Sequence, residues 1–206
     1  GVHGKQYAIF SEFDPEAVSF NPIADMTNTQ RVSTIMRSFD WGEKPNQYYL
    51  NQSSSALSDV LEKLTKDGHE VDLFDVYQEL KSKHDKEETS GILAQFKMLL
   101  NSDFGKCFRK GLANGKPSMT LKKARAEKIC IYIGCSTQGY SSIAKTVGKM
   151  FVSEAMNLSY WIGKTSESQQ EAISNGIGLF IDEAGSVLFP DFIDLVNKCR
   201  GSGINI

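Results

Sequence analysis

Four stretches between residues 27 and 103 carry hydrophobic residues at helical spacing. In each, apolar positions recur every three or four residues, the pattern of a helix that buries one face. The first set is Val32, Ile35, Met36 and Phe39. The later sets lie in residues 49–64, in residues 73–80 after the potential capping residue Asp72, and in residues 92–100. Together these stretches predict a compact all-α bundle.

The residues on either side of this bundle follow a different pattern. YAIF at 7–10 predicts a short strand, and KICIYIG at 128–134 and GIGLFIDE at 176–183 are apolar runs typical of buried strands. Helical patterns follow the last two runs, at residues 141–162 and 189–201. A strand, helix, strand, helix order at this spacing is typical of a parallel α/β unit. The fold class we predict is α/β plus all-α, with the helical bundle inserted in a partial parallel sheet.

The same patterns suggest where the segments begin and end. Residues 1–26 belong to the edge of the α/β domain, 27–103 form the all-α domain, 104–127 are a basic linker, and 128–206 return to the α/β domain. GSGINI at 201–206 starts another strand pattern, and a sheet of two or three strands is small. We therefore expect the chain to be a piece of a longer protein.

Charge is distributed unevenly along the chain. Residues 104–128 contain eight Lys or Arg and one acid, which leaves 15 basic and 24 acidic residues elsewhere (23 minus 8 and 25 minus 1). Such a segment either contacts nucleic-acid phosphates or is a solvated linker, and both interpretations stay open. The candidate phosphate contacts are Lys106, Arg109, Lys110, Lys116, Lys122, Lys123 and Arg125.

The cysteines and the hydrophobicity exclude several classes. The four cysteines have no CxxC or Cys/His ligand spacing, and the three histidines are dispersed, so we predict reduced thiols and no zinc site. No apolar run approaches the roughly 18 residues that a membrane-spanning helix needs. We therefore expect this chain to be soluble, which leaves a membrane-anchored parent protein open.

An acidic pair, Asp182 and Glu183, closes the strand pattern GLFIDE. The carboxyl end of a parallel strand is where α/β sheets bind ligands, and adjacent acids there can bind Mg²⁺ and activate water. The alternative is a helix N-terminus, which favours acids without any ligand. A complete phosphate-binding loop is missing, because Gly163-Lys164-Thr165 would need a glycine at Leu158.

Several segments resemble one family. FNP at 20–22, KICIYIG at 128–134 and GLFIDEAGSVLFPDFIDLVNKCRGSGINI at 178–206 are similar to type IV coupling proteins of the TraD/TraG branch. The resemblance implies a RecA-like (P-loop NTPase) motor domain with an inserted all-α domain, in a hexameric ATPase anchored at the cytoplasmic face of the bacterial inner membrane. That family delivers DNA with its relaxase, or effector proteins, to a type IV secretion channel.

The resemblance also implies roles for single residues. Asp182 would be the Mg²⁺ ligand of bound ATP and Glu183 the acid that activates water. Gln138 would face the nucleotide, and Arg200 would lie near a subunit boundary, although a loop amide and a helix C-terminal cation are their ordinary alternatives. The Walker A loop and the transmembrane helices of the family are missing, so we expect this fragment to be monomeric, without bound ATP and inactive alone.

Two alternative functions remain open. The chain could be a substrate-binding module without catalysis of its own, with the helical domain as the receptor for a relaxase, a relaxosome or an effector. It could also belong to a related DNA-pumping motor of the FtsK/HerA type, but the FNP segment and the large insertion argue against this. Because the helical domain is acidic, we expect it to bind a protein partner, and we expect DNA contacts at residues 106–128.

Overall fold

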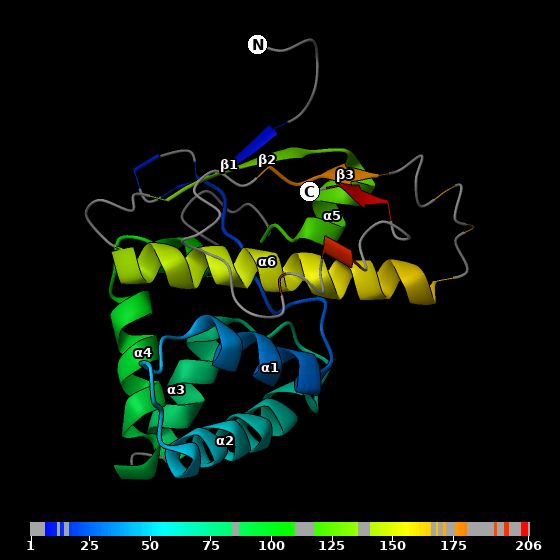
Figure 1. Ribbon diagram of the computed structural model, residues 1–206. Helices are drawn as coiled ribbons and strands as arrows, with labels where there is room; N and C mark the ends of the chain where they lie inside the picture. Colours follow the sequence, from blue (N-terminus) through cyan, green and yellow to red (C-terminus); the bar gives the residue numbers. More distant parts are fainter. Residues whose placement is uncertain are drawn as a thin grey trace.

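The computed structural model places the helical bundle and the strands on opposite sides of one long helix. It describes residues 7–11, 13–14, 17–83, 87–109, 118–135, 141–165, 168, 171, 176–180, 192, 196–197 and 203–205. The long helix is α6 (Ser141–Lys164). Figure 1 shows the bundle below α6 and the short strands above it, so α6 forms the middle layer of the molecule.

The helical bundle consists of the helices that the spacing of apolar residues predicts. They are α1 (Asn28–Ser38), α2 (Gln47–Thr65), α3 (Leu73–Lys83) and α4 (Ser90–Leu100), with a short 3₁₀ turn η1 (Glu87–Thr89) before α4. The largest buried side chains of this bundle come from all four helices: Ile35, Leu57, Leu61, Leu80, Ile92 and Phe96. None of the helices that the structure describes is long and apolar enough to cross a membrane.

Side-chain caps fix where three of these helices begin: Asn46 accepts the N–H of Tyr48 at α2, and α1 and α3 have reciprocal caps. At α1, the Gln30 side chain accepts the backbone N–H of Thr27 at 2.9 Å, while the Thr27 hydroxyl accepts the N–H of Gln30. At α3, the Asp72 carboxylate accepts the N–H of Asp75 at 2.9 Å, and Asp75 accepts the N–H of Asp72. Each pair satisfies two backbone donors that the first turn of a helix leaves free. The predicted cap at Asp72 is confirmed.

The strands form two parallel pairs. In the first, β1 (Tyr7–Ser11) lies beside β2 (Cys130–Gly134), with Tyr7 opposite Cys130 and Ser11 opposite Gly134. In the second, β3 (Ile177–Gly178) lies beside β4 (Ile204–Asn205). Parallel pairing agrees with the predicted α/β class. The described strands do not form one sheet, however, because β2 pairs with β1 whereas β3 pairs with β4.

The prediction that the apolar runs at 128–134 and 176–183 are buried strands is wrong for the described residues. Tyr132 of β2 is 66% exposed, and Phe180, which follows β3, is 96% exposed. In β1 the buried residues Ala8 and Phe10 alternate with more exposed neighbours. Alternation of this kind is typical of a strand that is covered on one face only, and here the covered face is the one toward α6.

A cluster of phenylalanine rings joins the strands to α6. The ring of Phe10 in β1 lies 5.7 Å from Phe20, 6.1 Å from Phe104, 5.5 Å from Phe108 and 5.1 Å from Phe151, measured between centroids. These residues come from β1, the segment before α1, the segment after α4, and α6. The same hydrophobic core continues into the bundle. The first strand pair and the bundle therefore share one core, whereas Ile204 of β4 belongs to a second, smaller cluster with Val152, Leu158 and Ile162 of α6.

The chain enters and leaves the bundle at the same place. The backbone N–H of Phe20 donates to the carbonyl of Cys107 at 2.8 Å. The N–H of Met119 donates to the carbonyl of Ser19 at 2.7 Å, and Met119 in turn accepts the N–H of Asn21 at 3.1 Å. The bundle is thus an excursion of the chain whose two ends are hydrogen-bonded to each other.

The segment expected to be a basic linker contains two helical elements. A 3₁₀ turn, η2 (Gly105–Phe108), follows α4, and a short helix, α5 (Leu121–Glu127), precedes β2. The Thr120 hydroxyl accepts the N–H of Lys123 at 3.1 Å and starts α5. Lys128 ends it in the left-handed region at φ 55°. Hydrophobic spacing does not predict α5, because a seven-residue helix is too short for a periodic pattern.

Candidate functional site

The residues expected to bind ATP, to activate water or to lie near a subunit boundary are outside the described part of the chain. These are Asp182, Glu183, Gln138 and Arg200. The structure does describe the strand that leads toward the acidic pair. The N–H of Leu179, just after β3, donates to the carbonyl of Asn205 at 2.7 Å. The strand pattern at the end of the chain is therefore present as β4, parallel to the strand before the acids.

The carboxyl ends of β1 and β2 define the best-described edge of the strand layer. Ser11 and Gly134 close the two strands side by side, and α6 begins at Ser141. The sequence between β2 and α6 contains a second incomplete phosphate-binding pattern. Gly134, Gly139 and Ser141 match G-x-x-x-x-G-K-[ST] except that Tyr140 stands in place of the lysine.

The described residues do not by themselves fit a magnesium nucleotide. Within the described part of the chain, no group of three or more His, Cys, Asp or Glu side chains could hold a metal ion. The lysine that a phosphate-binding loop uses is replaced by Tyr140 between β2 and α6. No catalytic step follows from the geometry of these residues.

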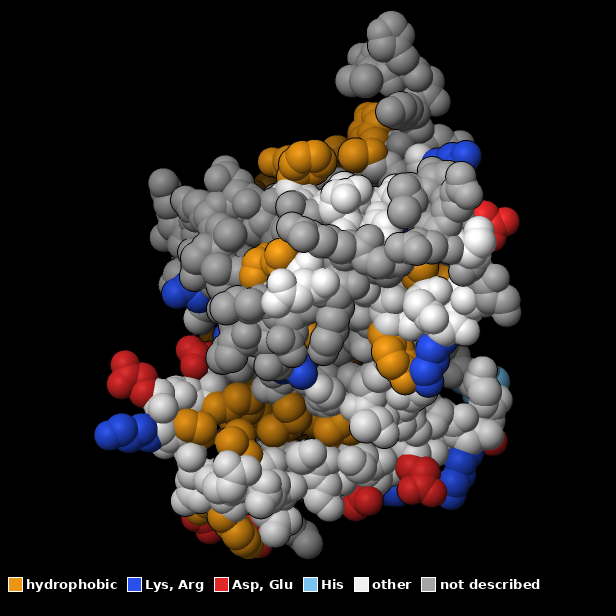
Figure 2. Space-filling view, turned by 45° about the vertical axis from the view of Figure 1, so that its right-hand side comes forward, with side chains coloured by type: hydrophobic (Ala, Val, Ile, Leu, Met, Phe, Trp, Pro, Cys, Tyr) orange, Lys and Arg blue, Asp and Glu red, His pale blue; other side chains and the backbone are white. Residues whose placement is uncertain are grey.

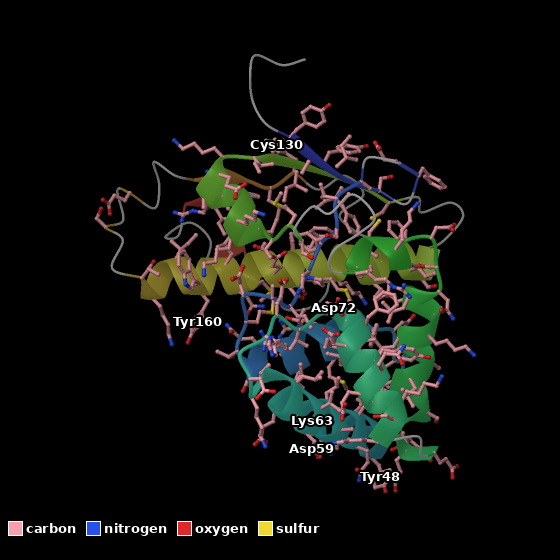
Figure 3. The ribbon with its side chains drawn as sticks, turned by 180° about the vertical axis from the view of Figure 1, so that it is seen from behind. Tyr48, Asp59, Lys63, Asp72, Cys130 and Tyr160 are labelled. Atoms are coloured by element: carbon pink, nitrogen blue, oxygen red, sulfur yellow. The ribbon has the colours of Figure 1, made fainter. Side chains whose placement is uncertain are left out.

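The structure divides the basic segment between two places. Lys106 and Arg109 lie in and just after η2, whereas Lys122, Lys123 and Arg125 lie on α5. Helix α5 packs near the C-terminal end of α6, while η2 follows α4 at the opposite end (Figures 1 and 3). Lys110 and Lys116 lie outside the described residues. The described cations therefore form two groups.

Arg109 and Lys122 contact aromatic rings within the protein. The Arg109 guanidinium lies 4.1 Å from the centre of the Phe74 ring. The Lys122 ammonium lies 4.5 Å from the Trp161 ring and 3.7 Å from a carboxylate oxygen of Asp25. A nucleic-acid phosphate would have to compete with or share these contacts.

The bundle carries a groove that could receive a partner. It lies between α1 and α2, has a volume of about 500 Å³, and is lined by the apolar side chains of Val32 and Met36 together with Ser54, Ser58 and Glu62. On the face shown in Figure 2, one patch of hydrophobic side chains lies in the lower half of the molecule, over the bundle, and another group lies near the top. An apolar floor with hydroxyl groups around it can bind a protein segment that presents both apolar and polar groups.

A buried glutamate on α6 was missed at the level of sequence. Glu154 is 6% exposed, and its carboxylate accepts the backbone N–H of Leu121 at 2.7 Å. Burial raises the pKa of Glu154 well above its usual value; the Leu121 hydrogen bond opposes this rise and the nearby Asp25 adds to it. The signal was available, since Glu154 lies four residues after Met150 and four before Leu158, on the buried face of the helix.

A scan against protein-family models, a search of curated proteins and a search of solved structures each found no match for this chain. Its function therefore has to be inferred from the residues and their arrangement.

Proposed function

We propose that this chain is part of a type IV secretion or conjugation coupling ATPase, a motor that delivers DNA with its relaxase, or effector proteins, to the secretion channel. The observation that carries this proposal is the inserted helical bundle. Its two ends are joined by the hydrogen bonds between Phe20 and Cys107 and between Ser19 and Met119. They meet beside a parallel strand pair, as expected for an all-α domain inserted in a RecA-like motor domain.

The FNP segment supports this arrangement through Asn21. Its side chain is buried and donates to the carbonyl of Val71 at 3.0 Å and to Glu70 at 3.1 Å, while its own oxygen accepts the N–H of Ile23. Asn21 therefore ties the entry of the bundle to the residues just before α3. A residue with this task would be needed wherever a helical domain is held at a fixed angle on a motor.

The bundle is the part to which we assign recognition of a partner. Between residues 27 and 103 there are nine Lys or Arg and thirteen Asp or Glu, a balance of −4. An acidic surface disfavours direct binding of DNA and favours a protein with a positive patch. The α1–α2 groove offers the apolar contact that such a relaxase, relaxosome component or effector would need.

The catalytic roles in this proposal rest on the family resemblance. They assign Asp182 to Mg²⁺, Glu183 to the activation of water, Gln138 to the nucleotide and Arg200 to a subunit boundary. The assembled motor would be a homo-hexamer at the cytoplasmic face of the inner membrane. A chain that only binds the substrate is the second candidate, and the described groove on the bundle is the observation that favours it.

The test is ATP turnover by the full-length protein, measured as phosphate release in wild type and in Glu183→Gln. We expect the variant to lose roughly 10²–10⁴-fold in turnover, because a general base contributes about that much, and to keep its affinity for ATP. Glu127→Gln, at an exposed position of α5, is the matched control and should leave turnover unchanged. A Glu183→Gln protein that turns over within a few-fold of wild type would show that the assignment is wrong.

The same measurement separates the two candidate functions. A full-length protein that binds a relaxase or effector but releases no phosphate is a binding module. For the chain as given, a fluorescent ATP analogue with Mg²⁺ should show no saturable binding below millimolar concentration, because the loop amides and lysine that hold a triphosphate are incomplete.

A further inference from the structure

A small cavity lies where the bundle meets α5 and α6. It is lined by Asp25 from the entry segment, Lys122 from α5, and Glu154, Asn157 and Trp161 from α6, among others, and we call it the junction pocket. Its volume is about 20 Å³. One bound water needs about 10–15 Å³ by this measure, so the pocket has room for a single small occupant.

One oxygen of Glu154 indicates that such an occupant is needed. Oxygen Oε1 accepts the N–H of Leu121, but Oε2 is buried and has no hydrogen-bond partner among the described residues. Leaving a buried polar atom unpaired costs about 1–3 kcal/mol, more if it is charged. Buried polar atoms are normally hydrogen-bonded, and because Glu154 lines the junction pocket, an occupant of the pocket could supply the missing partner.

The charges around the pocket define the chemistry of that occupant. Asp25 accepts the Thr120 hydroxyl at 2.9 Å and lies 3.7 Å from the Lys122 ammonium. The half-buried Arg31 also interacts electrostatically with Asp25. Among the described residues, the one charged side chain with a resolved effect on Glu154 is Asp25, which has the same sign. Among the described residues, Lys122 and Arg31 therefore interact with Asp25. No cation among them has a resolved effect on Glu154.

We propose that the junction pocket binds one small unit of positive charge next to Glu154 Oε2, either a proton or a dehydrated monovalent metal ion, and that this occupant holds the bundle against α5 and α6. A proton on Oε2 would turn that oxygen into a donor to a water in the pocket. A monovalent ion would be coordinated by Glu154, with Asp25 on the same wall. In both cases the neutralised carboxyl group keeps Oε1 on the first turn of α5.

The direction of the Glu154 pKa agrees with this proposal. Burial holds the pKa above its usual range, so the folded chain binds the proton more tightly than the unfolded chain does. Stability must then fall as the pH rises from the ordinary glutamate pKa toward the raised folded value, and level off above it. The proposal concerns the attachment of the bundle and does not depend on ATP or on the identity of the partner.

Thermal unfolding of the whole chain tests the proposal. Melting temperatures are measured from pH 5 to 9 in choline chloride, NaCl and KCl of equal ionic strength, for wild type, Glu154→Gln and Asp59→Asn. Glutamine keeps an oxygen that can accept the Leu121 N–H but cannot ionise, so the fall with pH should vanish in Glu154→Gln. It should persist in Asp59→Asn, a control at an exposed position on α2.

The salts distinguish the two occupants. A wild-type melting temperature that rises saturably with Na⁺ or K⁺ at pH 9, but not with choline, identifies a metal ion. A fall with pH that is the same in all three salts identifies the proton. Identical responses of wild type and Glu154→Gln to both pH and salt overturn the proposal.

Trp161 provides a second measurement that needs no substitution at Glu154. It lines the junction pocket, and the sequence contains two tryptophans, so a Trp41→Phe chain reports on Trp161 alone. Its fluorescence should titrate with a midpoint above the ordinary glutamate range, or shift with Na⁺ or K⁺ at high pH. A signal that responds to neither overturns the proposal even where Glu154→Gln fails to fold.

Discussion

The helical bundle and the strand layer bury their apolar residues in different ways. In the bundle, the largest side chains are almost completely buried between helices of the same segment, as for Leu57, Leu80 and Phe96. In the strand layer, Phe10 is buried against residues from outside the layer, while Tyr7 and Tyr132 remain 73% and 66% exposed. The bundle thus buries much of its apolar surface between its own helices, although its core is continuous with that of α6, whereas β1 depends on α6 and on the segments that flank the bundle.

This difference indicates which part can exist without the other. A segment that supplies its own caps and its own core can fold as a unit. Short parallel strands gain little from their own pairing and need a covering layer. We therefore expect the bundle to survive changes that disrupt the strand layer, and single substitutions in the two regions should reveal that asymmetry.

Phe10→Ala should have the largest effect. Its ring contacts four other phenylalanines of the junction between β1 and α6, so its removal should cost about 3–5 kcal/mol of unfolding free energy. We expect hydrogen exchange to accelerate in β1 and β2 while the amides of α2 stay protected. Tyr132→Ala, on the exposed face of β2, is the control and should cost less than about 1 kcal/mol. Equal loss of protection in α2 and β1 would show that the two regions unfold as one.

The strand layer is also where prediction from sequence reached its limit. The helices of the bundle were predicted well because caps such as Asp72 and the spacing of Val32, Ile35 and Met36 are local signals. Parallel pairing joins residues far apart in sequence, as Tyr7 with Cys130, and no local pattern specifies the neighbour. The apolar run of β2 suggested burial on both faces, but periodicity alone does not reveal whether a second layer covers it.

The predicted sites show the same contrast between local signals and contacts that only the fold creates. Sequence can propose that Asp182 and Glu183 follow a strand, but it does not say which charges the fold brings together. Lys122 looked like a surface cation of a basic segment, yet the fold places it on Trp161 and beside Asp25. Glu154 was overlooked because a single acid in a long helix is usually solvated; its spacing from Met150 and Leu158 indicated the buried face, and the hydrogen bond to Leu121 shows what partner it has there.

Asn21→Ala should have the next largest effect, at the attachment of the bundle. The side chain is 1% exposed and makes hydrogen bonds to Val71, Glu70 and Ile23, so its loss leaves buried groups unpaired at a cost of about 1–3 kcal/mol. We expect limited proteolysis to cut faster near residues 17–26 while the helical circular dichroism signal is retained. Asn51→Ala, at an exposed position of α2, should change neither. Unchanged proteolysis in Asn21→Ala would show that Asn21 does not hold the bundle in place.

Asp72→Ala should have a smaller effect, confined to the bundle. Removing a cap costs about 0.5–2 kcal/mol; the N–H of Asp75 would lose its acceptor, while the backbone N–H of residue 72 could still donate to the Asp75 carboxylate. Hydrogen exchange should increase in the first turn of α3 and remain unchanged in β1 and β2. The measurement therefore complements Phe10→Ala, because each substitution should loosen one region and spare the other. Increased exchange in β1 of Asp72→Ala would contradict the independence of the bundle.

The smallest expected effects are on DNA binding, in which α5 and the bundle should also differ. If α5 binds phosphates, Lys123→Glu and Arg125→Glu should each weaken retention on DNA and reduce the salt slope by about one unit for every phosphate that is no longer bound. Lys122→Glu is less informative, because Lys122 also contacts Asp25 and the Trp161 ring. Lys97→Glu, at an exposed position of α4 in the acidic bundle, is the matched control and should leave the slope unchanged.

The isolated bundle, residues 27–103, extends this last test. At physiological salt it should capture a relaxase or effector with a positive patch but retain no DNA, because its charge balance is −4. Tight DNA binding by the bundle alone, or an equal change of slope in Lys97→Glu and Lys123→Glu, would assign nucleic-acid contact to the bundle instead. An α5-specific change would place that contact at the junction, next to the buried Glu154, where loading of DNA and attachment of the bundle could influence each other.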